Sequence, residues 1–457
     1  MCVSKLRRGH FALSRILIVS ALLGAFVGSG CHRSLPRMRP HWSAGLAEGS
    51  QHHATSAWRA GVLRTMRIPD GAFVRAAGTE LVVNGSTFAF VGANFDGIHG
   101  NDQRRRLDDV LDAMAEDGIT VGRQWVVGEH ATDSCHRGLK PYLFRCGPDG
   151  FLEESYQQLD RLLARSREHG IRVILTLSNQ WGDYGGIPVY LRWAGLPTDE
   201  RSSEAFYSDR RIQAFFRAGL DRLLERVNSV TGDRYIDDPT IFSWELMNES
   251  MVTTTAGAAA RRRWIAEMAR YIKLRDPNHL VAAGLRGYDM QHQRQEWIQV
   301  HRIPEIDYCD SHLYPQEEPH ITSWELLRDF LSDRAQLAHR VIRKPLIIGE
   351  FGFRTDSAPT WLGLPRAEWV ARMLMHIRTQ RAAGALVWIY QPYFNKPRDY
   401  GIYVDRPETD DLRRALRTAA QQVAASLTPR PPARRQLPAT ATDAGLRPPE
   451  VCRGGPG

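Results

Sequence analysis

Apolar runs alternate with amphipathic helical patterns between residues 69 and 426 of the chain. Short runs rich in β-branched and aromatic residues predict buried strands, and apolar residues at i, i+3 and i+4 predict helices that cover them. The expected strands are Ala89–Phe95, Thr120–Val127, Arg172–Ser178, Ile241–Glu249, Leu280–Arg286, Ile306–Tyr314, Leu346–Phe351 and Ala385–Tyr390. The expected helices include Arg104–Glu116, Glu153–His169, Arg210–Val230, Ala258–Arg275, Ser323–Arg343, Arg366–Ala383 and Asp410–Leu427.

This alternation predicts an α/β fold with eight parallel strands, because parallel neighbours need crossover helices and are buried on both faces. Eight such units match a (β/α)8 TIM barrel. An open doubly wound sheet would show a glycine-rich phosphate-binding turn after its first strand, and GANFDGIHG lacks that pattern. Before the barrel, Phe73–Val83 and Ser86–Phe95 form a predicted N-terminal β-hairpin through the turn dipeptide Asn84-Gly85.

The most unusual charge distribution of this sequence lies at the two ends of the chain. The 457 residues are 43% hydrophobic and 24% charged, which is typical of a globular protein. The net charge of +9 comes mainly from residues 1–30, with four basic residues and no acidic one, and from residues 427–457, with five arginines against two acids. The intervening chain is nearly neutral, so we expect no nucleic-acid partner.

Residues 1–31 read as an export signal, with a basic start and the apolar run Ile16–Gly28, which is too short to span a bilayer. Gly28-Ser29-Gly30-Cys31 resembles a bacterial lipoprotein cleavage box, so lipidation of Cys31 and plain secretion both stay open; a large aliphatic residue is usual where Gly28 stands. Residues 32–68 have the composition of a linker and residues 427–457 that of a disordered tail. The catalytic domain is therefore expected at 69–426.

The cysteines suggest one disulfide and no metal site. Cys135 and Cys146 lie in one predicted loop, and an exported protein can join them, although two free thiols remain the alternative. Cys309 lies in an apolar strand and is expected to be a buried thiol, whereas Cys452 has no evident partner. No Cys/His set has metal-ligand spacing, so neither a metal nor another cofactor is expected.

Candidate chemistry lies where the predicted strands end, because the active sites of such barrels are built at the carboxyl ends of the strands. Two of these ends carry a glutamate, Glu249 in WELMNES and Glu350 in IIGEFGF, and a paired acid and carboxylate is what glycoside hydrolysis requires. The other candidate residues at strand ends, suited to binding sugar hydroxyls or stacking on sugar rings, are Arg123, Trp125, Asn179, Trp181, Asn248, His312, Tyr314 and Trp388.

The strand-end motifs together resemble glycoside hydrolase family 5, a family of retaining barrel glycosidases, over residues 70–426. DPTIFSWELMNE, NQWGDYGG, DYCDSHLYP and KPLIIGEFG are most similar to its endo-β-1,4-mannanase branch. The resemblance implies that Glu249 is the general acid/base and Glu350 the nucleophile. It also implies that Arg123 and Tyr314 keep Glu350 ionised and that Asn248 binds the 2-hydroxyl of the sugar. His312 would line the site, and Trp388 would form the floor beneath the sugar that is attacked.

Three positions depart from the family pattern. Ser250 replaces the proline of Asn-Glu-Pro, Arg286 stands where mannanases tend to carry an acid, and Gln316-Glu317-Glu318 replaces an aromatic residue. These positions shape the cleft more than the chemistry. A β-glucanase or cellulase, an exo-β-mannosidase and an inactive surface carbohydrate-binding protein therefore remain alternatives to a monomeric, polysaccharide-cleaving endo-mannanase.

Several residues have a structural interpretation beside the functional one. Glu245 lies four residues before Glu249 on the same strand face, so we expect it to support the site from below. Arg123 is a lone charge on an apolar strand and should pair with a carboxylate. Trp193 is a further candidate for stacking on sugar. Tryptophans 264, 297, 324 and 369 are assigned to the core, and the runs Arg104–Arg106 and Arg261–Arg263 to solvated helix faces.

Overall fold

The computed structural model describes most of the barrel and little of the chain outside it. The described residues are 67–95, 103–126, 128–130, 143–287, 291–318, 320–354, 363–391, 400–427 and Gly457. The chain divides into two compact units at Thr55 and Ser56, and every described residue belongs to the second unit. The predicted signal, most of the linker and almost all of the tail lie outside the described residues. Ile68, assigned to the linker, is buried and donates its N–H to Arg167 O at 3.1 Å, so the folded domain begins by residue 68.

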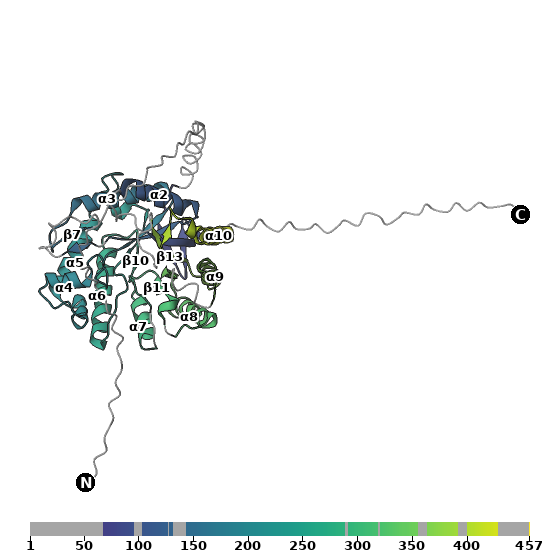
Figure 1. The fold of residues 1–457 in the computed structure, drawn as a ribbon. Helices are drawn as coiled ribbons and strands as arrows, with labels where there is room; N and C mark the ends of the chain where they lie inside the picture. Colours follow the sequence, from purple (N-terminus) through teal and green to yellow (C-terminus); the bar gives the residue numbers. More distant parts are fainter. Residues whose placement is uncertain are drawn as a thin grey trace, which may run out of the picture. The chain divides into compact units, whose positions relative to one another are not determined.

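A nearly closed parallel barrel forms the centre of this unit, as predicted (Figure 1). Its strands hydrogen-bond in the order β10-β9-β8-β5-β4-β13-β12-β11, and β14 pairs with β13 in parallel. The strand bounds are β4 Phe90–Phe95, β5 Val121–Trp125, β8 Arg172–Thr176, β9 Ile241–Glu245, β10 Leu280–Ala282, β11 Cys309–Leu313, β12 Leu346–Phe351, β13 Gly384–Gln391 and β14 Ile402–Tyr403.

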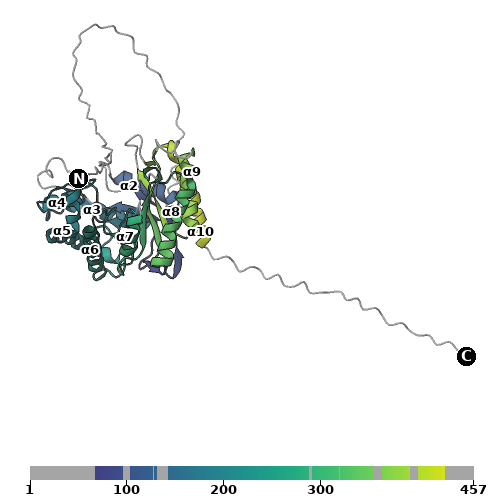
Figure 2. The same ribbon diagram turned by 90° about the horizontal axis from the view of Figure 1, so that it is seen from below.

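Helices surround the strands, as Figures 1 and 2 show from two directions. Their bounds are α2 Gln103–Glu116, α3 Glu153–Glu168, α4 Ile187–Trp193, α5 Arg210–Leu224, α6 Thr255–Lys273, α7 Gln291–His301, α8 Trp324–Gln336, α9 Arg366–Thr379 and α10 Asp410–Leu427. Short helical turns are η2 Glu200–Tyr207, η3 Tyr235–Asp237, η4 Pro315–Glu317, η5 Leu337–Ile342 and η6 Pro407–Thr409. No helix in the part of the chain described here is long and apolar enough to cross a membrane.

Three predicted helix ends were wrong, and one of them is that of Arg366–Ala383, which ends at Thr379, shortly before Arg381 with its positive φ. The helix predicted over Arg210–Val230 ends at Leu224, because the Asn228 carboxamide accepts the N–H groups of Val230 and Thr231 in a side-chain-supported turn. The segment predicted as Ser323–Arg343 is α-helical only to Gln336 and continues as the wider turn η5. Helices α4 and α7 were missed.

The predicted N-terminal hairpin is present but is part of a three-stranded antiparallel sheet. The strands are β1 Val74–Ala77, β2 Glu80–Val83 and β3 Ser86–Phe88. β2 and β3 meet through Asn84 and Gly85, both with positive φ, as the dipeptide predicted. The predicted first arm, Phe73–Val83, consists of two strands, β1 and β2, which pair with each other. Ala89 separates β3 from the barrel strand β4. Phe88 packs against the apolar cluster that fills one end of the barrel.

The buried tryptophans confirm the core assignments. Trp264, Trp297 and Trp369 are fully buried, and the partly buried Trp324 packs on the same core. The interpretation of Arg261 was wrong, however: this side chain is buried and donates to Ser250 O at 2.7 Å, with Glu296 3.2 Å away. The side chains of Arg104–Arg106 lie outside the described part.

Candidate active site

Arg123, on β5, lies at the centre of a buried polar cluster beneath the strand ends. Its Nη2 donates to Glu245 Oε1 at 2.6 Å and its Nη1 to Glu350 Oε1 at 2.6 Å. The same guanidinium donates to Asn94 Oδ1 at 2.9 Å and to Asn248 Oδ1 at 2.8 Å. The expected carboxylate partner is confirmed, and there are two of them. Because a guanidinium keeps its charge, this cluster presents a permanent cation to Glu350.

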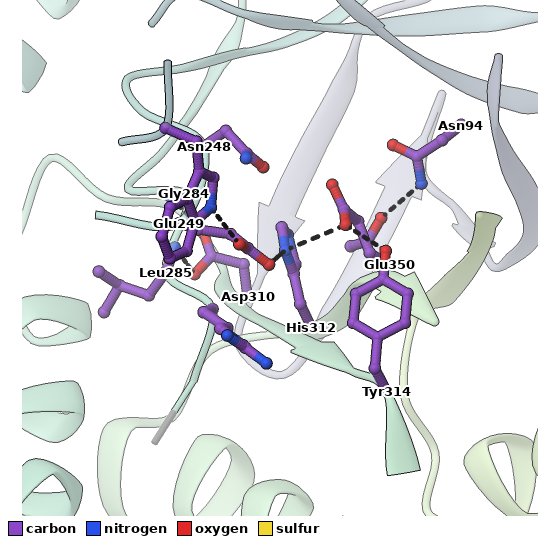
Figure 3. Close-up of polar contacts among 12 residues, drawn as sticks. Asn94, Asn248, Glu249, Gly284, Leu285, Asp310, His312, Tyr314 and Glu350 are labelled. Carbon is purple, nitrogen blue, oxygen red and sulfur yellow. Dashed lines mark hydrogen bonds and ion pairs between the residues drawn. The ribbon is translucent and has the colours of Figure 1, made fainter. Parts of the chain in front are cut away.

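Glu350, at the end of β12, receives a hydrogen bond on each carboxylate oxygen. Besides the Arg123 contact to Oε1, the Tyr314 hydroxyl donates to Oε2 at 2.5 Å (Figure 3). His312 Nδ1 lies 3.5 Å from the same Oε2. The residue before Glu350 is a glycine, and a Cβ at Gly349 would lie 3.0 Å from His312 Nε2, closer than ordinary packing distance.

Glu249 lies beyond the end of β9 and faces Glu350 across His312. The predicted strand Ile241–Glu249 is regular only to Glu245, and Glu249 itself has a positive φ of 55°, a conformation that costs a non-glycine residue energy. His312 Nδ1 lies 2.9 Å from Glu249 Oε1, and the Trp181 indole donates to Oε2 at 2.7 Å. Figure 3 shows the histidine between the two carboxylates.

The separation of the two carboxylates bears on their chemistry. One oxygen of Glu249, one nitrogen of His312 and one oxygen of Glu350 all lie within 4.8 Å of one another. Retaining glycosidases place their carboxyl groups about 5–5.5 Å apart, whereas inverting enzymes leave about 6.5–9.5 Å for a water molecule. The arrangement therefore fits direct attack on a sugar by one carboxylate. The three residues also have donor atoms suited to a metal ion.

Burial and neighbouring charges act differently on the three titratable groups. Burial opposes ionisation of Glu249, but the hydrogen bond and charge of His312, the charge of Arg286 and the Trp181 hydrogen bond together lower its pKa to about 2. Burial raises the pKa of Glu350, against the charges of His312 and Arg123. Burial lowers the pKa of His312 because it disfavours the charged imidazole, but the charges of Glu350 and Glu249 outweigh this effect and raise that pKa above the usual 6.5. These shifts favour a protonated His312 imidazole beside an ionised Glu249 carboxylate.

The amides and aromatic residues predicted from the sequence also gather here. Asn248 donates to Asn179 Oδ1 at 3.0 Å, which ties the ends of β9 and β8 together. Trp388, on β13, is partly exposed and lies with its ring centroid 5.7 Å from that of Trp125. Trp193 is not part of this cluster: its indole donates to His130 O, and its ring packs on Phe215.

Two residues of the cluster were not predicted to be part of it. Asn94, at the end of the first barrel strand, accepts from Arg123 and donates to Gly349 O at 3.0 Å. The strand-end criterion applied to the other strands would have found it. Asp310, on β11, accepts the N–H groups of Gly284 and Leu285 at 2.7 and 2.9 Å and so fixes the segment that carries Arg286. Its signal was weaker, because it lies inside a predicted strand.

The positions that depart from the family pattern lie along a cavity beside the site. This cavity, of about 1130 Å³, is lined by His312, Ser250 and Arg286 among others. Arg286 forms ion pairs with Glu317 at 3.4 Å and Glu318 at 3.7 Å. The wall that would bear an aromatic residue in the family pattern is therefore made of paired charges.

The cysteine predictions are only partly within the described residues. Cys146 is disulfide-bonded, and its predicted partner Cys135 lies outside them, so the pairing stays a prediction. Cys309 is a buried free thiol, as expected. Cys31 and Cys452 also lie outside.

A model of a protein family matches residues 71–379 of this chain, and its description is "GH family 5 beta-mannosidase-like". Mannan endo-1,4-beta-mannosidase 7 of Arabidopsis thaliana is 32% identical over 320 residues, covering 65% of this chain and 71% of that protein. Mannan endo-1,4-beta-mannosidase 8 of Oryza sativa subsp. japonica is 29% identical, covering 74% of this chain and 97% of that protein.

Solved structures share the fold. The endo-beta-1,4-mannanase from Thermotoga petrophila superposes with a TM-score of 0.65 at 24% identity, covering 76% of this chain and 79% of that one. A family 5 mannosidase from Rhizomucor miehei gives a TM-score of 0.65 at 22% identity, covering 78% and 99% of the two chains.

Proposed function

Because this chain belongs to glycoside hydrolase family 5, in its β-mannosidase-like group, we propose that it cleaves internal β-1,4 linkages of mannan-type polysaccharides with retention of configuration. The observation that carries the proposal is the pair Glu249 and Glu350, whose oxygens lie within 4.8 Å of each other at the strand ends of a family 5 barrel. The relatives named for endo-acting mannan hydrolysis support the substrate class.

In the first step, a Glu350 oxygen forms a bond to the anomeric carbon while the bond from that carbon to the leaving sugar oxygen breaks. Glu249 gives its proton to that oxygen, so the leaving chain departs neutral. The proton reaches Glu249 Oε1 from His312 Nδ1 over the 2.9 Å hydrogen bond between them. Arg123 and Tyr314 hold Glu350 ionised and aimed before the attack.

In the second step, Glu249 removes a proton from a water molecule, which attacks the same carbon from the side that the leaving chain vacated. The bond to Glu350 breaks, its electron pair returns to the carboxylate, and the sugar leaves with its original configuration. The positive charge that develops on the sugar ring is stabilised by the negative charge of the Glu350 carboxylate, which the hydrogen bonds from Arg123 and Tyr314 hold in place.

The substrate assignment is tested with the purified full chain on galactomannan, glucomannan, carboxymethylcellulose and mixed-linked β-glucan, with reducing ends measured in parallel. Release from the two mannans, abolished in Glu350→Gln, is expected. Release from the glucans alone would contradict the substrate class while leaving the mechanism in place. Rapid loss of viscosity per bond cut would support endo action, and monosaccharide as the first product would contradict it.

We also propose that the protein is exported, on the strength of the basic start and apolar run in residues 1–31. The mature N-terminus, determined by mass spectrometry of the protein recovered from cells and medium, separates the two routes. A lipid-modified Cys31 in the membrane fraction, released by Cys31→Ala, indicates an anchored lipoprotein. Cleavage at another position with the protein in the medium indicates secretion, and an unprocessed N-terminus inside the cell would contradict export.

A further inference from the structure

Glu129 is a buried carboxylic acid that the proposed mechanism does not use. It belongs to β6, Glu129–His130, which pairs with β7, Arg145–Cys146, beside the barrel; Figure 1 labels β7 near α3 and α5. Only 5% of Glu129 is exposed. A carboxyl group in such a place is costly, so the contacts it makes need an account.

Those contacts hold the loop that follows β8, residues 177–186. The Glu129 backbone N–H donates to Tyr184 O at 3.0 Å, and its Oε2 accepts the N–H of Gly186 at 3.2 Å. Its Oε1 accepts the hydroxyl of Tyr190, on α4, at 3.2 Å. The main chain and the side chain of Glu129 thus bind both the loop and helix α4, which follows the loop.

The loop follows an unusual backbone path beside Glu129. Tyr184, Gly185 and Gly186 have φ values of 61°, 117° and 64°, which the two glycines adopt without strain and Tyr184 adopts at a cost in energy. A Cβ at Gly185 would lie 2.6 Å from Glu129 O and 2.8 Å from Oε2. The loop is therefore packed directly on Glu129, with no room for a side chain between them.

The same loop carries three contacts to the active site. Trp181 donates to Glu249 Oε2 at 2.7 Å, and Asn179 accepts from Asn248 at 3.0 Å. Tyr184 packs edge-on against Trp125 with ring centroids 5.3 Å apart. A shift of the loop would therefore move the hydrogen bond on the acid/base together with the amide beside it.

We propose that Glu129 is a positioning residue for the acid/base: by binding the backbone of residues 184–186 it sets where Trp181 meets Glu249. This inference rests on the proposed function, since the acid/base role belongs to the hydrolysis of mannan. Glu129 touches neither the substrate nor the reacting atoms and acts through the loop.

The surroundings of Glu129 let its charge change near neutral pH. Burial raises its pKa to about 7, against the Gly186 and Tyr190 hydrogen bonds and the charge of Arg145. Among the residues that the structure describes, Arg145, on β7, is the cation near it, and Tyr156, on α3, and Tyr190 are the other titratable groups around it. Helix α5 faces this space with Phe216, Gly219, Leu220 and Leu223, and the remaining cavity of about 30 Å³ has room for a water molecule.

The sign of the pH effect follows from the hydrogen bond to Gly186. An ionised carboxylate accepts an N–H bond about twice as strongly as a neutral group does. Glu129 therefore holds the loop best above pH 7 and loosens it as the pH falls through 7. The substitution Glu129→Gln imitates the protonated form at every pH.

The test compares Glu129→Gln with the wild-type full chain on galactomannan across pH 5 to 9, beside Trp181→Phe and the double variant. We expect kcat to fall about 3–10-fold at pH 8 with little change in KM, and the ratio of wild type to variant to approach 1 near pH 5. In the double variant the loss should be smaller than the product of the two single losses, because part of the effect of Glu129 passes through Trp181.

A ratio that stays constant with pH, or losses that multiply in the double variant, would overturn the proposal and leave mannan hydrolysis intact. An inactive wild type would instead contradict the proposed function. If Glu129→Gln does not fold, Tyr190→Phe removes the Oε1 partner while keeping the ring, and the same pH-dependent ratio, smaller in size, is expected. A flat ratio for Tyr190→Phe counts against the proposal.

Discussion

The two sides of the active site hold carboxylates of similar burial in opposite ways. On the β12 side, Glu350 is bound by Arg123, whose charge is permanent, and by the Tyr314 hydroxyl. On the β9 side, Glu249 is bound by His312, whose charge changes with pH, and by the neutral indole of Trp181. One carboxylate is thus bound by a cation that keeps its charge, and the other is linked to a proton that can move.

This difference supports the proposed roles of the two carboxylates more directly than their burial does. A nucleophile must stay ionised and still, which suits a permanent cation held by Glu245, Asn94 and Asn248. A general acid/base must gain and lose a proton in each cycle, which suits a histidine at 2.9 Å. The structural contrast predicts that changes on the two sides have different chemical signatures.

The largest effect is expected from removing each carboxylate. Glu350→Ala and Glu249→Ala should each lower kcat on mannan by about 10⁴-fold or more, as removal of a group that acts as part of a catalytic unit does. With azide and an activated aryl β-mannobioside, however, the two variants should diverge. Azide in place of Glu350 attacks from the opposite face and gives the α-azide, whereas azide in place of the Glu249-activated water gives the β-azide.

Product anomers are read by proton NMR, with each glutamine variant as a control that leaves no space for azide. The same anomer from both alanine variants would contradict the division of roles. The reversed pattern would exchange the two assignments.

A smaller effect is expected from Arg123→Lys, which keeps the charge but loses the planar set of donors. We expect kcat/KM to fall roughly 10²-fold, since one well-placed donor in a dry site is worth about that much. The pKa of Glu350 should rise further once its guanidinium partner is gone, so the acidic limb of kcat/KM should move to higher pH. The pH profile and Tm are the measurements.

Arg226→Lys is the matched control for that variant. Arg226 is also buried and pairs with Asp160 and Glu153, at 2.6 and 2.9 Å, away from the strand ends. Arg226→Lys should lower Tm by about as much as Arg123→Lys does, and it should leave kcat/KM and the acidic limb of its pH profile near those of the wild type. Equal losses of activity in both variants would mean that Arg123 contributes stability alone.

His312→Gln addresses the movable proton, with a smaller expected loss. The pKa of His312 is raised above 6.5, so the wild-type alkaline limb should lie above pH 6.5, where this proton is lost. In the variant, Glu249 must hold the proton without His312, so the alkaline limb of the pH profile should move to lower pH. We expect about a 10-fold loss of kcat at pH 7 and a smaller one at pH 5. His376→Gln, on α9, is the control, and an unmoved limb in His312→Gln would contradict the role.

The fold and most members of this site could be predicted from the sequence because both follow from local patterns. Buried runs and strand ends are local, and the barrel brings Glu249 and Glu350 to one edge although 100 residues lie between them. The need of Arg123 for a partner was also predictable, since an apolar strand cannot hold a lone charge.

Contacts made by loops and backbone were not predictable in this way. The role of Glu129 depends on three positive φ values in residues 184–186 and on a strand pair between β6 and β7, and neither has a strong sequence signal. Arg261 was misassigned for a related reason: its partners Ser250 O and Glu296 come from a loop and from α7, so periodicity within its own helix does not reveal them.

The smallest effect is expected from Arg286, at the open end of the Glu249 side. Its charge contributes to the lowered pKa of Glu249, but its side chain is 32% exposed and also pairs with Glu317 and Glu318. Water and salt screen such charges, so Arg286→Gln should change kcat/KM by about 2–5-fold and raise the pKa of Glu249 only slightly. The alkaline limb should move slightly toward higher pH, the direction opposite to that in His312→Gln.

Salt distinguishes this electrostatic effect from a change in the shape of the cleft. The difference between wild type and Arg286→Gln should shrink as salt rises from about 0.02 to about 0.5 M, because the Debye length falls from about 20 Å to about 4 Å over that range. Arg294→Gln, which breaks the exposed pair with Asp333 on α7 and α8, should show no such dependence. A difference that persists at high salt would mean that Arg286 acts by contacting the leaving sugar, and the electrostatic contrast between the two sides would then rest on His312 and Arg123 alone.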